Sequence, residues 1–166
     1  MKKDYRLKII ENELENAKRS HAGLKPGFNL GEFYASKFNA CWRAFDAYLN
    51  FKFNCDVVQT RLDEFKRKYR DWYKHSYFSF SDRFRTAVTT LSEYQVEDMR
   101  HKPKPPITIS DRTDLDEIIE VIYRVRCNLE HGGKLMTEDK NVILVENSGD
   151  VLYELMERIM AEFEKM

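Results

Sequence analysis

The sequence predicts an all-α protein, an up-and-down bundle of five to six helices with little or no strand. Apolar residues recur at three- and four-residue spacing along almost the whole chain, and no segment shows the alternation typical of a strand. Aromatic residues make up 13% of the 166 residues. Each buried ring removes on the order of 150–250 Å² from water, so a substantial core can form. The length is typical of one domain, and we expect residues 1–166 to form a single helical unit.

Two amphipathic helices are expected in the first third of the chain. The first runs from about Asp4 to Lys18, and the second runs from about Glu32 to Phe53. The loop between them, Ser20–Gly31, contains the glycines and the proline that end a helix. We expect the second helix to be central, because aromatic residues occupy one face and alanines let a neighbour approach closely. These residues are Phe38, Trp42, Phe45, Ala40, Ala44 and Ala47.

Two further helices are expected before a proline-rich linker. One starts near Asp56, and the next starts near Ser79 or Ser81, since serine is a favourable N-cap. The linker, His101–Pro106, holds three of the four prolines of the chain. Proline lacks the backbone donor that a helix requires, so the fourth helix must end before this linker.

The last part of the chain predicts one sharply bounded helix and one whose start is less defined. Thr113–Asp116 resembles a capping box with Asp in place of Glu, which marks the start of the fifth helix. Gly132 and Gly133 end it, because glycine readily adopts the left-handed conformation of a helix terminus. The pattern leaves open whether residues 142–149 form a short strand or begin the last helix.

Composition and charge exclude several classes of protein. The chain has 28 Lys and Arg and 28 Asp and Glu, so its formal net charge is zero. Nonspecific binding of nucleic acid needs a clear basic surplus, so a polyanion must meet a local patch. The longest aliphatic run, Val142–Val145, is far shorter than the ~20 residues of a membrane span, and no apolar signal region follows Met1. We therefore expect neither membrane insertion nor export.

The cysteines predict neither a disulfide framework nor a metal site. There are three, Cys41, Cys55 and Cys127, and they are scattered without the spacing of zinc ligands. The sequence also lacks a Gly-rich phosphate loop and a nucleophile elbow. We expect a cytoplasmic protein with no metal and no cofactor.

The end of the fifth helix concentrates polar side chains and is the candidate site. Arg126 and His131 are five residues apart, which gives an angular offset of about 140° and a rise of about 7.5 Å on an ideal helix. Both could edge one exposed groove. Arginine suits phosphate oxygens and histidine can move a proton near neutral pH, so the pair indicates phosphoryl chemistry. Possible supporting residues are Asn128, Arg124, Glu130 and Lys134.

Two of these supporting residues have a specific interpretation. Asn128 could bind a phosphate or a ribose hydroxyl. Glu130 could instead form an ion pair with Arg126, four residues before it, and would then compete with a phosphate. Spacing alone is weak support, because Arg70 and His75 repeat it in an ordinary charged helix.

A second candidate is a basic and aromatic segment between residues 61 and 85. Basic groups interleaved with rings could hold single-stranded RNA by phosphate contact and stacking. The candidate RNA-binding residues are Lys66, Arg67, Lys68 and Arg70. The alternative, which we favour, is that the rings belong to the core and the charges form a solvated face.

The run Arg126–Lys134, following an apolar helix, resembles the signature of the HEPN superfamily, in which an Arg is followed after four to six residues by a His. The segment Phe38–Tyr48 is similar to the Trp- and Phe-rich central helix common in that family. The resemblance implies a homodimeric bundle whose motif helices face each other. Many members of the family are metal-independent endoribonucleases, so the resemblance also implies this activity. Arg126 and His131 match the catalytic pair of the family. Arg124 also fits this signature, because six residues lie between it and His131.

The resemblance also implies a composite site and a choice of roles. Each chain supplies one motif histidine, so an isologous dimer would provide both a general base and a general acid. The implied substrate is single-stranded or looped RNA, in a toxin–antitoxin or defence setting with an antitoxin or nucleotidyltransferase-like partner. Some toxin members carry a modified Tyr two residues after the His, where this chain has Gly133. The alternative is a catalytically inactive HEPN-like module for dimerisation or for nucleotide or partner binding.

Overall fold

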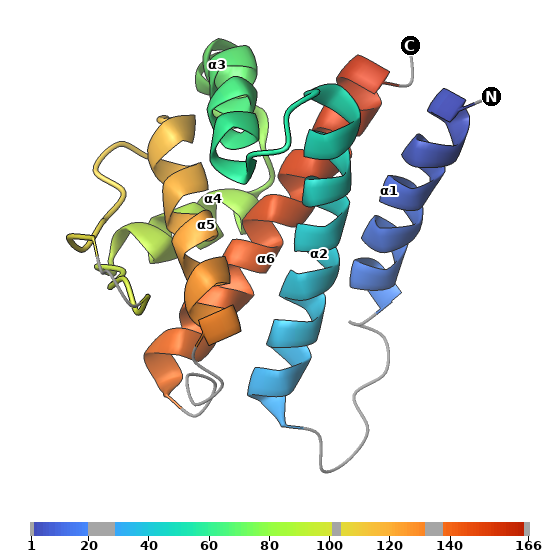
Figure 1. The fold of residues 1–166 in the computed structure, drawn as a ribbon. Helices are drawn as coiled ribbons and strands as arrows, with labels where there is room; N and C mark the ends of the chain where they lie inside the picture. Colours follow the sequence, from blue (N-terminus) through green and yellow to red (C-terminus); the bar gives the residue numbers. More distant parts are fainter. Residues whose placement is uncertain (1, 20–28, 101–103, 132–137, 165–166) are drawn as a thin grey trace.

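The computed structural model describes residues 2–19, 29–100, 104–131 and 138–164, and it shows an all-helical bundle (Figure 1). In these ranges there are six α-helices: α1 (Lys2–Arg19), α2 (Leu30–Lys52), α3 (Val58–Ser76), α4 (Asp82–Ser92), α5 (Leu115–His131) and α6 (Asp139–Ile159). A 3-10 turn, Tyr77–Ser79, precedes α4, and a π-helical turn, Met160–Glu164, follows α6. The extended pairing in the described ranges is one isolated bridge between Val96 and Ile107. The predicted fold class is confirmed.

Two helices share the centre of the bundle. α2 packs between α1 and α6, and α6 also contacts α4 and α5. α3 packs mainly on α5, so α5 has α3 and α6 as neighbours. In Figure 1, α1 lies at one edge, α5 and α6 run in opposite directions, and α4 crosses behind them. The helix predicted to be central is therefore well buried, but α6 has the larger number of neighbouring helices.

The core that holds this arrangement is rich in aromatic rings. One cluster of buried apolar side chains extends over all six helices. Its rings meet edge to face at several places, for example Phe45 on Phe65 at 4.9 Å between ring centroids, a favoured geometry for aromatic pairs. No helix in the described part of the chain combines the length and the apolar character that a membrane span requires.

The helix boundaries follow the predicted signals with one correction. Ser81 caps α4, because its hydroxyl accepts from the Phe84 backbone N–H at 3.1 Å. The cap of α5 is Asp114 and not Thr113: the Asp114 carboxylate accepts from the Asp116 and Glu117 N–H groups at 2.8 and 3.4 Å. The Thr113 hydroxyl is already engaged with Asp111, which explains the shift of one residue.

The structure also describes regions on both sides of α5. α4 ends at Ser92, before the proline-rich linker as predicted, and residues 93–100 and 104–114 are largely irregular. Residues 142–149, which the sequence pattern left open, lie inside α6. Gly132 and Gly133, predicted to end α5, lie outside the described residues, although α5 does end at His131.

A buried carboxylate organises the irregular segment after α4. Asp98 accepts from the Arg100 backbone N–H at 3.1 Å, the Arg100 Nε at 2.8 Å and the Lys104 backbone N–H at 2.9 Å. These donors stabilise the charged form, so the Arg100 guanidinium and the two backbone groups hold the pKa of Asp98 well below its usual range. The side chain is fully shielded from solvent.

We expect Asp98→Asn to lower the free energy of unfolding at pH 7 by about 2 kcal/mol, because charge-assisted hydrogen bonds are lost. Because the pKa of Asp98 is lower in the folded state, its charge stabilises the folded protein fully above the unfolded pKa of about 4. This contribution decreases as the pH falls below that value. The difference between wild type and variant should therefore shrink below pH 4. Urea unfolding at pH 7 and pH 3 measures it, with Asp82→Asn as the exposed control. A difference that grows at low pH would contradict this account.

Candidate functional site

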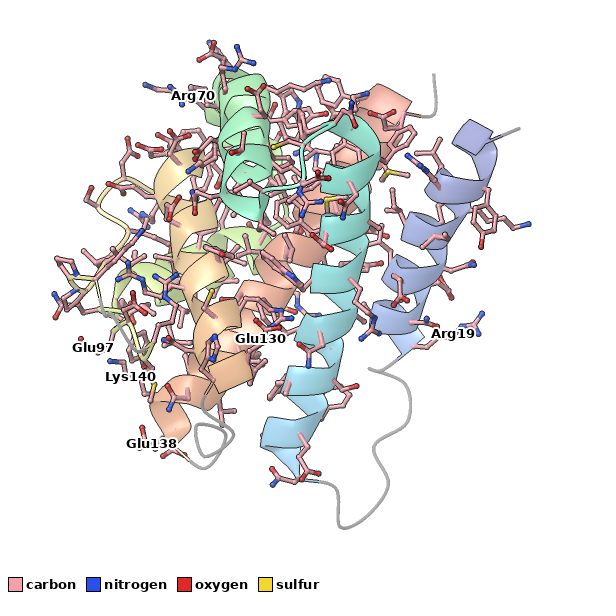
Figure 2. The ribbon with its side chains drawn as sticks, in the orientation of Figure 1. Arg19, Arg70, Glu97, Glu130, Glu138 and Lys140 are labelled. Atoms are coloured by element: carbon pink, nitrogen blue, oxygen red, sulfur yellow. The ribbon has the colours of Figure 1, made fainter. Side chains whose placement is uncertain are left out.

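An open groove of about 320 Å³ lies between α2 and the last turns of α5. α2 contributes Asn39, Trp42 and Arg43, and α5 contributes Arg126, Leu129 and Glu130. Figure 2 shows Glu130 at the end of α5, on the side that faces α2. The groove thus contains one of the two predicted catalytic residues, together with three α2 residues that the sequence analysis did not assign to the site.

Arg126 is held in this groove by an aromatic platform. Its guanidinium carbon lies 5.9 Å from the centroid of the Trp42 ring, within the range of a cation–π contact. The Trp42 ring in turn stacks on Tyr123, with 6.0 Å between centroids and 26° between planes, and meets Phe45 edge to face. Tyr123 and Arg126 are three residues apart on α5, so both face α2. Trp42 is therefore the side chain that fixes where the guanidinium lies.

Arg126 also forms an ion pair with Glu130, as the sequence spacing suggested. The Arg126 side chain is 20% exposed and that of Glu130 is 50% exposed. The Arg126 Nε is buried and has no hydrogen-bond partner among the described residues. A buried donor without a partner costs about 1–3 kcal/mol, so the guanidinium retains unused hydrogen-bonding capacity.

His131 is the last residue of α5 and is exposed. It is not among the described residues that line the groove. In the single chain, therefore, the structure places Arg126 in the groove and His131 at the exposed end of the same helix. An exposed imidazole can exchange protons with solvent or with a bound group.

Asn128 and Arg124 do not support this groove, contrary to the sequence-based expectation. The Asn128 amide donates to the Glu97 carbonyl at 2.7 Å and accepts from the Met99 N–H at 3.0 Å. Arg124 donates to the carbonyls of Val96 and Pro105. Both side chains are buried and fasten the segment after α4 to the face of α5 away from α2; Figure 2 labels Glu97 on that side. Lys134, the remaining supporting residue, lies outside the described residues.

Three of the four predicted RNA-binding residues on α3 pair with acidic side chains. Lys66 is buried and pairs with Asp63 at 2.9 Å and with Glu120 of α5 at 2.6 Å. Arg67 pairs with Glu64, and Arg70 pairs with Asp116 of α5 at 2.8 Å, at the outer end of α3 in Figure 2.

Lys68 lies 5.5 Å from the ring centroid of Tyr69, and burial together with the neighbouring Lys52 lowers the pKa of Lys68. The rings of Phe65, Tyr69 and Phe84 belong to the core. The basic segment thus matches the alternative that the sequence analysis favoured, a paired and solvated face above core aromatics.

The groove and the exposed His131 combine a fixed cation with a group that can carry a proton. Among the described residues, no three His, Cys, Asp or Glu side chains lie close enough together to hold a metal ion. Stabilising negative charge and moving a proton are the two tasks that phosphoryl transfer requires of side chains. Comparison of the chain with protein-family models, with curated proteins and with solved structures gave no match.

Proposed function

We propose that this protein is a HEPN-type, metal-independent endoribonuclease that cleaves single-stranded or looped RNA as a homodimer. The observation that supports this most is the position of Arg126, held on Trp42 in an open groove near the end of α5, with His131 exposed at the last residue of the same helix. The resemblance of Arg126–Lys134 to the HEPN signature supplies the reaction class. A cytoplasmic role in defence or in a toxin–antitoxin pair belongs to the same proposal.

The proposed reaction assigns one task to each group. One His131 takes the proton of the ribose 2′-OH as the 2′ oxygen attacks phosphorus. As the new P–O2′ bond forms and the P–O5′ bond breaks, a second histidine gives a proton to the departing 5′ oxygen. Arg126 stabilises the charge that develops on the phosphate oxygens. The products are a 2′,3′-cyclic phosphate and a 5′-OH end.

The dimer follows from this assignment, because one chain supplies one motif histidine. An isologous two-fold interface repeats every contact and would bring His131 and Arg126 of both chains together. The exposed end of α5 leaves His131 accessible to such a partner.

A second candidate function is a catalytically inactive HEPN-like module that binds a partner or a nucleotide. The ion pair between Arg126 and Glu130 favours it, since a carboxylate already occupies the guanidinium. This module would have the same fold and the same groove without the cleavage reaction.

Incubation of the purified protein with end-labelled RNAs of varied sequence in EDTA separates the two candidates. We expect cleavage products with 2′,3′-cyclic phosphate and 5′-OH ends, identified by their response to phosphatase and kinase treatment. Sedimentation at micromolar concentration should show a dimer. Absence of cleavage above background across these RNAs would favour the inactive module, and a strictly monomeric protein would remove the composite site.

A further inference from the structure

We infer that the groove between α2 and α5 is a two-cation phosphate subsite in which Arg43 is the second cation and Glu130 is an internal anion that the phosphate displaces. The inference rests on the proposed ribonuclease function for the source of the phosphate, a single-stranded nucleic acid. It adds Arg43 on α2 as a binding residue, and it makes the competition between Glu130 and a phosphate, which the sequence suggests, a part of the site.

The ion pair between Arg126 and Glu130 is weak, so a phosphate can replace the carboxylate. In a helix, an acidic residue four positions before a basic one pairs better than the reverse order, and here the Arg comes first. Glu130 also lies in the last turn of α5, where the negative end of the helix dipole disfavours a carboxylate. Its side chain is half exposed, and such pairs contribute only about 0.3–0.5 kcal/mol.

Arg126 is arranged to accept a better partner than Glu130. Trp42 restrains the guanidinium, so little side-chain entropy remains to be lost when an anion binds. The buried Nε has no partner among the described residues. A phosphate offers several acceptor oxygens and can pair with arginine through two parallel hydrogen bonds. It therefore presents more acceptors to the guanidinium than the Glu130 carboxylate does.

Arg43 supplies positive charge from the other wall of the same groove. Its Nε and Nη2 donate to one oxygen of Glu13 on α1, at 3.1 and 3.0 Å, and this contact orients the guanidinium. The side chain is 58% exposed and lines the groove with Asn39 and Trp42. Two guanidinium groups and an indole ring thus line one groove, the combination of cation and ring that holds a nucleic-acid backbone.

Fluorescence anisotropy with a labelled single-stranded RNA whose riboses are all 2′-O-methylated tests the inference, because this probe lacks the attacking hydroxyl and cannot be cleaved. Glu130→Gln should tighten binding by about 3- to 10-fold, since a like charge near the phosphate is removed. Arg43→Gln should weaken binding by about 5- to 10-fold and lower the salt dependence of log Kd by about one unit.

A matched pair on α1 provides the controls. Glu15 and Arg19 form an exposed ion pair with the same four-residue spacing, and Figure 2 shows Arg19 on the outer side of the bundle. Glu15→Gln and Arg19→Gln change the net charge by the same amounts and should alter Kd less than about 2-fold. Circular dichroism would confirm that all four variants are folded.

Each outcome has a defined meaning. The inference is overturned if wild type does not bind the probe, if Glu130→Gln does not tighten binding, or if Arg43→Gln behaves like Arg19→Gln. Displacement of the RNA probe by inorganic phosphate at the same concentration as the probe would also overturn it, because the groove would then bind RNA no more tightly than free phosphate. Binding with the expected pattern but without cleavage of ordinary RNA removes the ribonuclease proposal and supports this subsite. Cleavage with unchanged binding in both variants removes this subsite alone.

Discussion

His131→Ala is expected to reduce the rate of RNA cleavage by about 10²–10⁴-fold, the usual contribution of general acid–base catalysis. The effect should be at the upper end, because in a two-fold composite site one substitution removes both the base and the acid. Folding should be unaffected, since His131 is exposed at the end of α5. Single-turnover cleavage of a labelled RNA in EDTA measures the change. His75→Ala is the matched control, because His75 is exposed on α3 five residues after Arg70; it should keep the wild-type rate.

Mixed dimers test whether the two histidines act together. If equal amounts of wild-type and His131→Ala chains pair at random, about one quarter of the dimers are fully wild type. A site that needs both histidines should then retain about one quarter of the wild-type activity, whereas independent sites should retain about one half. Retention of one half, or a His131→Ala homodimer as active as wild type, would contradict the composite mechanism.

Asp150→Asn is expected to lower the free energy of unfolding by about 3–5 kcal/mol, a large part of the stability of a typical domain. Asp150 on α6 pairs with Lys37 of α2, whose side chain is 5% exposed. The same carboxylate accepts from Arg83 of α4 at 2.9 and 3.0 Å. Neutralising it leaves the buried ammonium of Lys37 without this counter-charge in the interface between the two central helices, where an uncompensated charge is costly.

A second variant separates the buried charge from the shape of the interface. Lys37→Met combined with Asp150→Leu removes both charges and fills similar volume, so its stability should lie within about 1–2 kcal/mol of wild type. Arg83→Gln, at a side chain that is 59% exposed, should cost about 1 kcal/mol or less. Urea unfolding followed by circular dichroism measures all three. The explanation fails if the double variant is as unstable as Asp150→Asn.

Most of the fold could be predicted from the sequence, because an amphipathic helix is indicated by the spacing of apolar residues within a short stretch of chain. The three- and four-residue spacing identified all six helices, and serine at the start of α4 indicated the cap that the structure shows. The cap of α5 was placed one residue early, at Thr113, because the competing contact between Thr113 and Asp111 has no spacing signal. Residues 142–149 were ambiguous because a short aliphatic run suits a strand and a buried helix equally well.

The site was less predictable because its partners come from distant parts of the chain. Arg126 and its pairing with Glu130 follow from spacing within one helix. The hydrogen bonds of Asn128 to Glu97 and Met99 cannot be predicted from spacing, because they depend on how the segment after α4 packs against α5. The aromatic-rich segment that contains Trp42 is visible in the sequence, but only the contacts of Trp42 with Tyr123 and Arg126 in the structure show that Trp42 holds Arg126.

The two faces of α5 carry separate duties. Arg124 and Asn128 lock the helix from behind, so its rotation about its own axis does not depend on the residues that face the groove. Glu130 and His131 in turn are exposed and contribute little to packing, whereas Arg126 packs on Trp42. We therefore expect substitution of the exposed Glu130 or His131 to leave the attachment of α5 to the segment after α4 unchanged.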